Sequence, residues 1–226
     1  MRKANQILEK ITNEYPQLSI STPLVEKTVD FLSLLKKRNQ TMNLTSIRDD
    51  EQMVVKHVLD SLAIVKLFSN DEFEQFAQGK TLDLGSGAGL PGAVLCIFNL
   101  LMNLTSIDKS PKKIDFQLSV KNKLGLEGFH PLHANLKKFI MDPNHHNQYN
   151  LILARAFDQI QGIFELSRDL LVKNGYLVLW KGRNWQKEYD VVPSVLKNRF
   201  DLESKVTYQF GDGTFGGTIL RFSLKA

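Results

Sequence analysis

Residues 81–95 read TLDLGSGAGLPGAVL, a short apolar run followed by four glycines in eight positions. Gly85, Gly87 and Gly89 have no side chain to hold a ligand away from the main chain, so backbone N–H groups at a helix start can contact it directly. Pro91 is well placed to open that helix. A tight turn alone needs only one or two glycines. The stretch therefore predicts a strand, a glycine loop and a helix that together bind a ligand.

Short β-type runs alternate with helical spans from residue 80 onward. The runs are residues 81–84, 104–108, 128–133, 150–154, 176–180, 205–210 and 217–222. Strands separated by helices form right-handed βαβ units, which predict a doubly wound parallel sheet with helices on both faces. The last two runs, joined through GDGTFG, have the pattern of a C-terminal antiparallel hairpin. Such a sheet binds its ligand beyond the carboxyl ends of the strands, where the strand order reverses.

The chain before residue 79 has helical spacing instead. Apolar side chains recur in three helical segments, and Pro23 lies in the first turn of the second. The spaced residues are Ala4, Ile7, Leu8 and Ile11, then Val25, Val29, Leu32 and Leu35, and finally Val54, Val58, Leu62 and Val65. Asp49 or Asp50 is the expected cap of the third helix. We expect an N-terminal helical cap over residues 1–78 and an α/β core over residues 79–226.

The composition excludes several classes of protein. With 226 residues, 42% of them apolar, the chain can bury a substantial core. The apolar run near Leu90 is interrupted by Pro91, Gly92 and Asn99, well short of the roughly 18 residues that a membrane span requires. The charged start MRKANQILEK does not resemble a secretory signal, and a lone Cys96 cannot form an internal disulfide. We therefore expect a cytoplasmic protein that does not enter membranes.

The formal net charge of +5 is unevenly distributed along the chain. Residues 1–78 carry 10 basic and 11 acidic side chains, whereas residues 79–226 carry 19 and 13. The positive charge therefore accompanies the glycine-rich half. This distribution is expected if that half binds a polyanion.

Two kinds of ligand fit the glycine stretch. Gly87, Gly89 and Gly92 satisfy G-x-G-x-x-G, and Asp108 ends the next strand where the ribose-binding acid of a dinucleotide site belongs. The longer pattern D-x-G-x-G-x-G, which starts at Asp83, resembles class I methyltransferases that use S-adenosylmethionine. In those enzymes the glycine turn approaches the amino-acid end of the cofactor, and one carboxylate accepts both ribose hydroxyls. The spacing alone leaves both ligands open.

Several segments together resemble one family, the bacterial small-subunit rRNA methyltransferases RsmG, also called GidB, which methylate guanine at N(7). The matching segments are NLTSIR, HVLDSLAI, LDLGSGAGLPG, ID followed by KKIDF, ARAF and GYLVLWKG, in this order over about residues 39–183. GLPG followed about sixty residues later by RAF is far more specific than a glycine fingerprint. The resemblance implies a Rossmann-like class I methyltransferase core behind a helical cap, with S-adenosylmethionine as cofactor and 16S rRNA or the small ribosomal subunit as partner.

The resemblance, with the glycine pattern, also indicates which residues bind the cofactor. The predicted cofactor-binding residues are Gly85, Gly87, Leu90, Asp108, Leu136, Lys137 and Arg155. Leu136 is expected against the adenine, with a backbone amide near it. Where the family commonly has Arg, a small apolar residue and Glu, this chain reads Asn135, Leu136 and Lys137. At these positions backbone contacts are therefore a firmer expectation than side-chain contacts.

The reaction implied by the resemblance needs no general base, because guanine N(7) already carries an in-plane lone pair. Alignment and electrostatics are expected to supply the catalysis. The candidate catalytic residues are Arg155, which could hold the cofactor carboxylate or a phosphate, and Lys181, which with Arg183 could bind phosphate. ARAF replaces the motif that exocyclic amine methylation commonly uses, and Cys96 is not placed as a nucleophile for cytosine carbon-5. No metal-ligand cluster lies at the strand ends.

Other residues each allow a functional and a purely structural interpretation. Phe157 could stack on a base or pack in the core. Lys112 and Lys113 could contact RNA or form a solvated helix face. His57 and Asp60 share one helical face, and the resemblance implies that HVLDSL docks the cap onto the core, with His57 buried and hydrogen-bonded rather than catalytic.

The sequence thus predicts a cytoplasmic enzyme, expected to be a monomer, that transfers methyl from S-adenosylmethionine to guanine N(7) of 16S rRNA. Two alternatives stay open. One is a nicotinamide-dependent Rossmann oxidoreductase. The other is a non-catalytic RNA-binding module that retains the fold, which the departures at Asn135 and Lys137 motivate.

Overall fold

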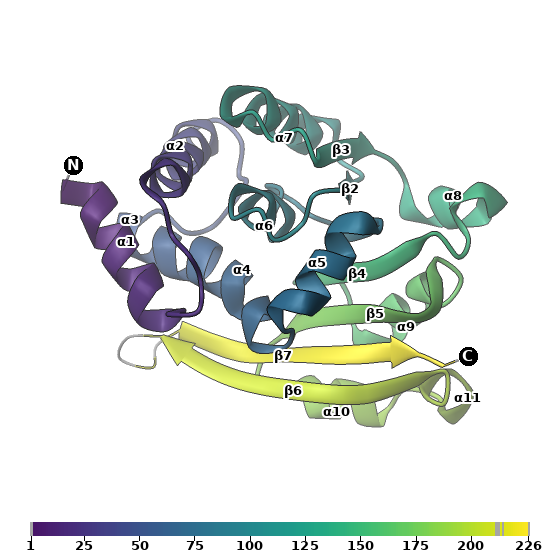
Figure 1. Ribbon diagram of the computed structural model, residues 1–226. Coiled ribbons are helices and arrows are strands. Elements are labelled where there is room, and N and C mark those ends of the chain that lie inside the picture. Colours follow the sequence, from purple (N-terminus) through teal and green to yellow (C-terminus); the bar gives the residue numbers. More distant parts are fainter. Residues whose placement is uncertain (1, 211–212, 214, 226) are drawn as a thin grey trace.

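The computed structural model describes residues 2–210, 213 and 215–225, and its centre is a seven-stranded sheet of order β3-β2-β1-β4-β5-β7-β6 (Figure 1). The strands are β1 (Thr81–Leu84), β2 (Leu104–Asp108), β3 (Phe129–His133), β4 (Tyr149–Arg155), β5 (Leu171–Lys181), β6 (Phe200–Phe210) and β7 (Phe215–Leu224). Strands β1 to β5 pair in parallel, whereas β7 pairs antiparallel with β5 and β6. The predicted doubly wound sheet and its C-terminal antiparallel hairpin are confirmed. Residues 211, 212 and 214 of the predicted turn lie outside the described residues.

Helices cover both faces of this sheet. On one face lie α1 (Arg2–Glu14), α2 (Thr22–Asn39), α3 (Asp50–Met53), α4 (Asp60–Leu62), α5 (Asn70–Gln78), α6 (Gly92–Ile97) and α7 (Pro111–Leu124), with the π-helical turn η1 (Val54–Leu59) and the 3₁₀ turn η2 (Ala63–Lys66). On the other lie α8 (Leu136–Met141), α9 (Ile160–Ser167), α10 (Trp185–Asp190) and α11 (Ser194–Lys197), with the 3₁₀ turn η3 (Pro143–His145). Within the described part of the chain, no helix is both long enough and apolar enough to cross a membrane.

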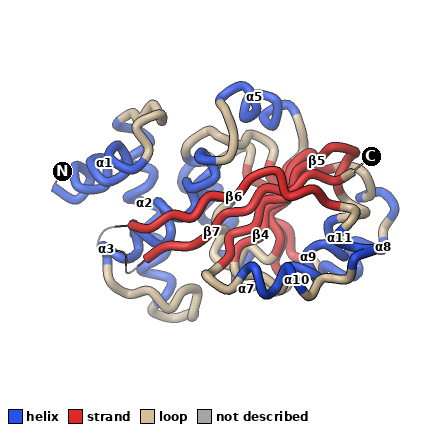
Figure 2. The backbone as a smooth tube through the Cα atoms, turned by 90° about the horizontal axis from the view of Figure 1, so that it is seen from below, coloured by secondary structure: helices blue, strands red, loops and turns tan. Residues whose placement is uncertain are grey.

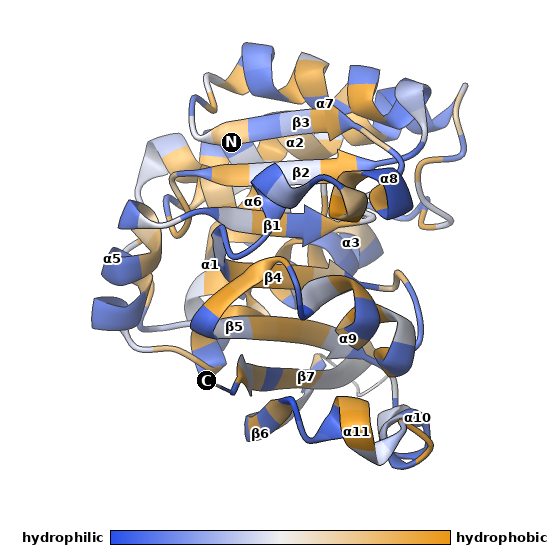
Figure 3. Ribbon diagram, turned by 90° about the vertical axis from the view of Figure 1, so that its right-hand side faces the viewer, coloured by the Kyte–Doolittle hydropathy of each residue, from blue (hydrophilic) through white to orange (hydrophobic). Residues whose placement is uncertain are grey.

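Alternating strand residues supply two hydrophobic cores, one on each face of the sheet. Leu151 and Leu153 of β4 belong to the core under the N-terminal helices, and the intervening Ile152 belongs to the core under α9. The central strands β4 and β5 are consequently apolar along most of their length (Figure 3). Such continuous apolar runs are typical of parallel strands covered on both faces.

The N-terminal helices share a core with the sheet. Fully buried Phe31 of α2 and Leu62 of α4 belong to the same apolar cluster as Leu151 of β4 and Ala93 of α6. Figure 2 shows the long strands β6 and β7 extending toward α3 from the body of the sheet. The division into domains at residue 78 stays a prediction, but residues on both sides of it stabilise one common core.

The expected third helix is present but interrupted. Asp49, one of the two expected caps, accepts a hydrogen bond from the backbone N–H of Gln52 at 2.9 Å, which confirms it. The helix then widens into η1, continues as α4 and ends as η2. The cause is competition for backbone carbonyls, since side chains from other elements donate to three of them. These bonds join Arg155 to Lys56 O at 3.1 Å, Tyr15 to Leu59 O at 2.6 Å, and Trp180 to Asp60 O at 2.7 Å.

Gly92 provides a test of how closely α6 packs on the sheet. A Cβ atom at this position would lie 2.8 Å from both Asp83 Oδ2 and Leu104 Cδ2. We expect Gly92→Ala to lower the free energy of unfolding by about 1–3 kcal/mol, because both neighbours are buried and cannot move aside cheaply. Urea denaturation measures the free energy of unfolding of each variant. Gly182→Ala is the matched control, since a Cβ there meets nothing within 4 Å, and equal stabilities of the two variants would contradict the prediction.

Candidate active site

A row of residues crosses the carboxyl edge of the sheet. The register of β1 with β2 and β4 places Gly85, which follows β1, level with Asp108 of β2 and Arg155 of β4. The pairs Asp108–His133 and Arg155–Trp180 extend this row to β3 and β5. The chain reverses its strand order between β1 and β4, which is where doubly wound sheets bind ligands. The structure thus brings three of the predicted cofactor-binding residues to one edge.

The glycine loop needs its glycines for two different reasons. Gly85, Gly87 and Gly89 have φ angles of +64°, +59° and +80°, a region that residues with a side chain rarely adopt. At Gly85 a Cβ would lie 2.1 Å from Cδ2 of Phe157, whose ring therefore packs on the loop. At Gly87 a Cβ would meet nothing within 4 Å, so the space in front of the loop is open. Leu90 is buried at the end of the loop.

Asp108 lies beside that open space. Its carboxylate accepts hydrogen bonds from Gly87 N at 2.9 Å and Ser110 N at 2.8 Å, and Lys113 Nζ is 3.7 Å away. The side chain is almost fully buried, so its position is well defined. A carboxylate held next to the open space in front of Gly87 fits the predicted ribose contact, because it has further acceptor sites for hydroxyl donors.

A buried amide supports the loop from behind and was not anticipated. Gln117 of α7 is fully buried, and its Nε2 donates to Ser86 Oγ and to Gly87 O, both at 2.9 Å. Its Oε1 accepts from Ser106 Oγ at 2.7 Å. Because every polar group in this set has a partner, the network holds the loop in one conformation. The signal in the sequence was a polar side chain three residues after Ile114, on the apolar face of the helix.

Asn135 explains the departure from the family pattern after β3. Its Oδ1 accepts from Lys137 N at 3.0 Å and from Lys138 N at 3.4 Å, so the side chain caps α8. Leu136 is half-buried against the core under α9, whereas the Lys137 side chain is exposed. The roles of Leu136 and Lys137 toward a cofactor stay predictions, and the cap occupies the amide of Lys137.

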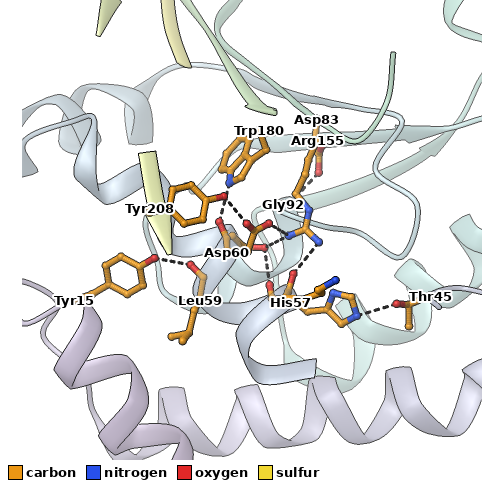
Figure 4. Close-up of polar contacts among 12 residues, drawn as sticks. Tyr15, Thr45, His57, Leu59, Asp60, Asp83, Gly92, Arg155, Trp180 and Tyr208 are labelled. Carbon is orange, nitrogen blue, oxygen red and sulfur yellow. Dashed lines mark hydrogen bonds and ion pairs between the residues drawn. The ribbon is translucent and has the colours of Figure 1, made fainter. Parts of the chain in front are cut away.

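Arg155 faces the N-terminal helices (Figure 4). Its Nη1 lies 3.1 Å from Asp60 Oδ2 and 3.0 Å from Ser61 Oγ. Asp60 also accepts a hydrogen bond from the Tyr208 hydroxyl of β6, and its backbone oxygen accepts from Trp180 Nε1. This confirms that HVLDSL docks the N-terminal helices onto the sheet. The predicted contact of Arg155 with the cofactor stays a prediction.

His57 is buried and hydrogen-bonded, as expected. Its Nε2 lies 3.0 Å from Thr45 Oγ1, which anchors the NLTSIR segment. Burial, and then the nearby Arg155 guanidinium, lowers the pKa of His57 from 6.5 to about 4. The imidazole is therefore neutral at physiological pH.

Asp83, the first residue of the glycine pattern, has a structural role. Its Oδ2 accepts from Gly92 N at 3.0 Å, which ties β1 to the start of α6. Complete burial raises the pKa of this carboxyl from 3.8 to about 7, and the Gly92 N–H and Arg155 oppose that rise.

Lys181 is engaged at the end of β5. Its Nζ lies 2.7 Å from Glu188 Oε2 and also donates to Asp158 O, and only 9% of its side chain is exposed. The ammonium therefore joins β5 to α10 and to the segment after β4. Arg183, two residues later, is exposed. The expected phosphate-binding role of these residues stays a prediction, and Arg183 is the more accessible of the two.

The described geometry matches one known family. Residues 24–209 match the family model of rRNA small subunit methyltransferase G, also called GidB. The chain belongs to the rRNA small subunit methyltransferase G family. A similar protein from Chromohalobacter salexigens, named ribosomal RNA small subunit methyltransferase G, is 35% identical over 188 residues, which cover 82% of this chain and 84% of the relative. A protein of the same name from Francisella tularensis is 32% identical over 163 residues, covering 72% and 73%.

Membership of the methyltransferase G family confirms several predictions made from the sequence. The resemblance inferred from the motifs is confirmed, and so is the predicted S-adenosylmethionine-dependent rRNA methyltransferase. The cofactor is therefore S-adenosylmethionine, not a nicotinamide dinucleotide. A solved O-methyltransferase from Bacillus cereus, in complex with SAH, has the same fold, with a TM-score of 0.62, 13% identity and 96% coverage of each chain.

The lowered pKa of His57 predicts a pH dependence of stability. Between pH 6.5 and 4 the unfolded chain takes up a proton at His57 that the folded chain, with its pKa of about 4, does not. The free energy of unfolding therefore falls as the pH falls through this window, by about 3 kcal/mol from this group. Urea denaturation of the wild type and of His57→Gln between pH 7 and 4 measures the difference.

The wild type has to be compared with His57→Gln because Asp83 changes the free energy of unfolding in the opposite direction as the pH falls. Its raised pKa of about 7 makes the folded chain bind the extra proton, so this contribution falls as the pH rises from 3.8 to 7. Asp83 is present in both proteins, so its effect cancels in the difference. Parallel pH curves for the wild type and His57→Gln would contradict the assignment.

Proposed function

We propose that this methyltransferase modifies N(7) of a guanine in 16S rRNA, in the bacterial cytoplasm where small subunits are assembled, with S-adenosylmethionine bound at the glycine loop. The observation that carries the proposal is the open space in front of Gly87, where a Cβ would meet nothing within 4 Å, beside the buried carboxylate of Asp108. Gly87 N donates to that carboxylate at 2.9 Å. Family membership supports the rRNA substrate. The guanine specificity rests on the motifs and on the chemistry below.

The residues present fit the cofactor. Asp108 would accept the ribose hydroxyls, the glycine backbone would hold the amino-acid end, and half-buried Leu136 would lie against the adenine. Asp108 is already ordered by Gly87 and Ser110, so little side-chain entropy is lost when a ligand binds.

The chemistry needs positioning more than proton transfer. When bound, S-adenosylmethionine supplies an electrophilic methyl: the N(7) lone pair forms the new N–C bond, the S–C pair returns to sulfur, and the positive charge passes to the base. Cys96 does not act as a nucleophile for carbon-5 chemistry, because burial raises the pKa of its thiol to about 12. No residue of the chain has to accept a proton, so alignment of the base is the main task of the protein.

Asp108→Asn tests the cofactor site. We expect S-adenosylhomocysteine to bind roughly 10- to 100-fold more weakly, because an amide offers one acceptor oxygen and no charge to the two ribose hydroxyls. Isothermal titration calorimetry measures the affinity. Asp115→Asn, at an exposed position of α7, is the matched control, and a thermal melt of each variant shows whether the fold is kept. Equal affinity in Asp108→Asn and the control would remove Asp108 from the site.

A methylation assay tests the reaction itself. Small subunits that lack the modification are incubated with the enzyme and methyl-labelled S-adenosylmethionine, and the product is mapped by chemical cleavage at 7-methylguanine. We expect label at one guanine of 16S rRNA. Label at another atom or base would refute the N(7) assignment. Cofactor binding with no transfer to rRNA would favour the non-catalytic RNA-binding module.

A further inference from the structure

A cavity lies on the β4 side of the row of strand ends. It is lined by Thr45 and Ser46 of the NLTSIR segment, by Lys56 and Asp60 of the interrupted helix, by Arg155, and by Phe215 of the hairpin. Strand β6 runs in the same direction as β1 to β5. The end of β6 that leads into β7 therefore lies at the same edge of the sheet as the carboxyl ends of those strands. Asp108, the proposed ribose ligand, is two strands away, on the other side of Gly85.

The place of this cavity in the row suits a methyl acceptor. Adjacent strands are about 4.8 Å apart, so β2, which carries Asp108, and β4, which carries Arg155, are separated by about 10 Å, with β1 between them. A cofactor whose ribose is held at β2 and whose amino-acid end is held at β1 leaves β4 as the side from which the acceptor approaches. The cavity is at that position, and Arg155 is the residue common to the row and to the cavity.

The lining offers a surface for an aromatic ring. Phe215 is half-buried, and Lys56 Nζ lies 4.5 Å from the centroid of its ring. An aromatic face is the usual stacking partner of an unpaired base, and an adjacent ammonium can donate to a base acceptor. Guanine presents O6 beside N7, so a donor at O6 leaves the neighbouring N7 lone pair accessible.

The acidic residue of the cavity matches the other edge of guanine. The side chain of Asp60 is 24% exposed, and the hydrogen bond from Tyr208 and the ion pair with Arg155 use only part of its acceptor capacity. A carboxylate can accept from both N1–H and the N2 amino group of guanine. Adenine has neither donor at these positions, so this arrangement discriminates between the two purines.

The wall of the cavity is already ordered. Asn39 Oδ1 accepts from Leu44 N at 2.8 Å and from Thr45 N at 3.0 Å, and Asn39 Nδ2 donates to Thr45 O at 2.8 Å. The Thr45 hydroxyl is in turn fixed by His57. A preformed wall reduces the entropy that is lost when a base enters.

We propose that this cavity receives the target guanine after it leaves its stack in the rRNA, with its ring against Phe215 and its N1 and N2 edge toward Asp60. The inference rests on the proposed function, because it assigns the base-binding part of the same site. It makes Phe215 and Asp60 substrate-binding residues. The NLTSIR segment forms one wall of the cavity.

Phe215→Leu and Phe215→Tyr test the proposal. Leucine keeps an apolar side chain at the start of β7 but removes the aromatic face, whereas tyrosine keeps it. We expect kcat/KM for small subunits to fall roughly 10- to 100-fold in Phe215→Leu and to stay near the wild-type value in Phe215→Tyr. The affinity for S-adenosylhomocysteine should be unchanged in both variants, since it does not depend on the target base. A thermal melt of each variant shows whether the fold is kept, because the Phe215 ring also packs against the core.

Two results would overturn the inference. One is an unchanged kcat/KM in Phe215→Leu while the wild type forms 7-methylguanine. The other is a loss of S-adenosylhomocysteine affinity in Phe215→Leu that is as large as the loss of kcat/KM, which would assign the cavity to the cofactor. A wild-type enzyme that forms no 7-methylguanine would refute the proposed function and the guanine assignment together, so failure of the proposed function is distinguishable from failure of the cavity alone.

Discussion

The arrangement of the active-site edge depends on the docking of Asp60. Its side chain meets Arg155 at the end of β4 and Tyr208 on β6, and its backbone oxygen accepts from Trp180 on β5. One residue of the N-terminal helices therefore joins three strands of the sheet. Because the ion pair is only partly exposed and each partner has further hydrogen bonds, removing one partner would leave a poorly solvated charge. Burial and the neighbouring Asp60 accordingly raise the pKa of the Tyr208 hydroxyl.

The same contacts explain why the segment around residue 57 departs from a regular α-helix. A side chain that donates to a helix carbonyl competes with the N–H four residues later. Here three such donors come from Tyr15, which directly follows α1, from β4 and from β5, and the helix responds with a π-helical turn. The irregular turn is thus a consequence of docking, and it presents Lys56 and Asp60 to the cavity.

The glycine loop shows a different kind of constraint, one that is local. Its positive φ angles require glycine whatever surrounds them, and Asp83 binds the start of the following helix within nine residues. The support given by Gln117 is less local, since it bridges about thirty residues to Ser86 and Gly87. Rigidity at this loop therefore comes both from backbone geometry and from a buried polar network.

The sequence alone was sufficient for features carried by neighbouring residues. The strands, the strand–glycine loop–helix unit, the antiparallel hairpin and the family follow from periodicity, the spacing of the glycines and ordered motifs. The partners of polar side chains were not accessible in this way. Arg155, whose contact with the cofactor stays a prediction, also contacts Ser61, 94 residues away, and Tyr208 reaches Asp60 across 148 residues. Only tertiary packing decides such contacts, because a planar guanidinium or a carboxylate can satisfy several partners equally well, and the fold determines which of them is within reach.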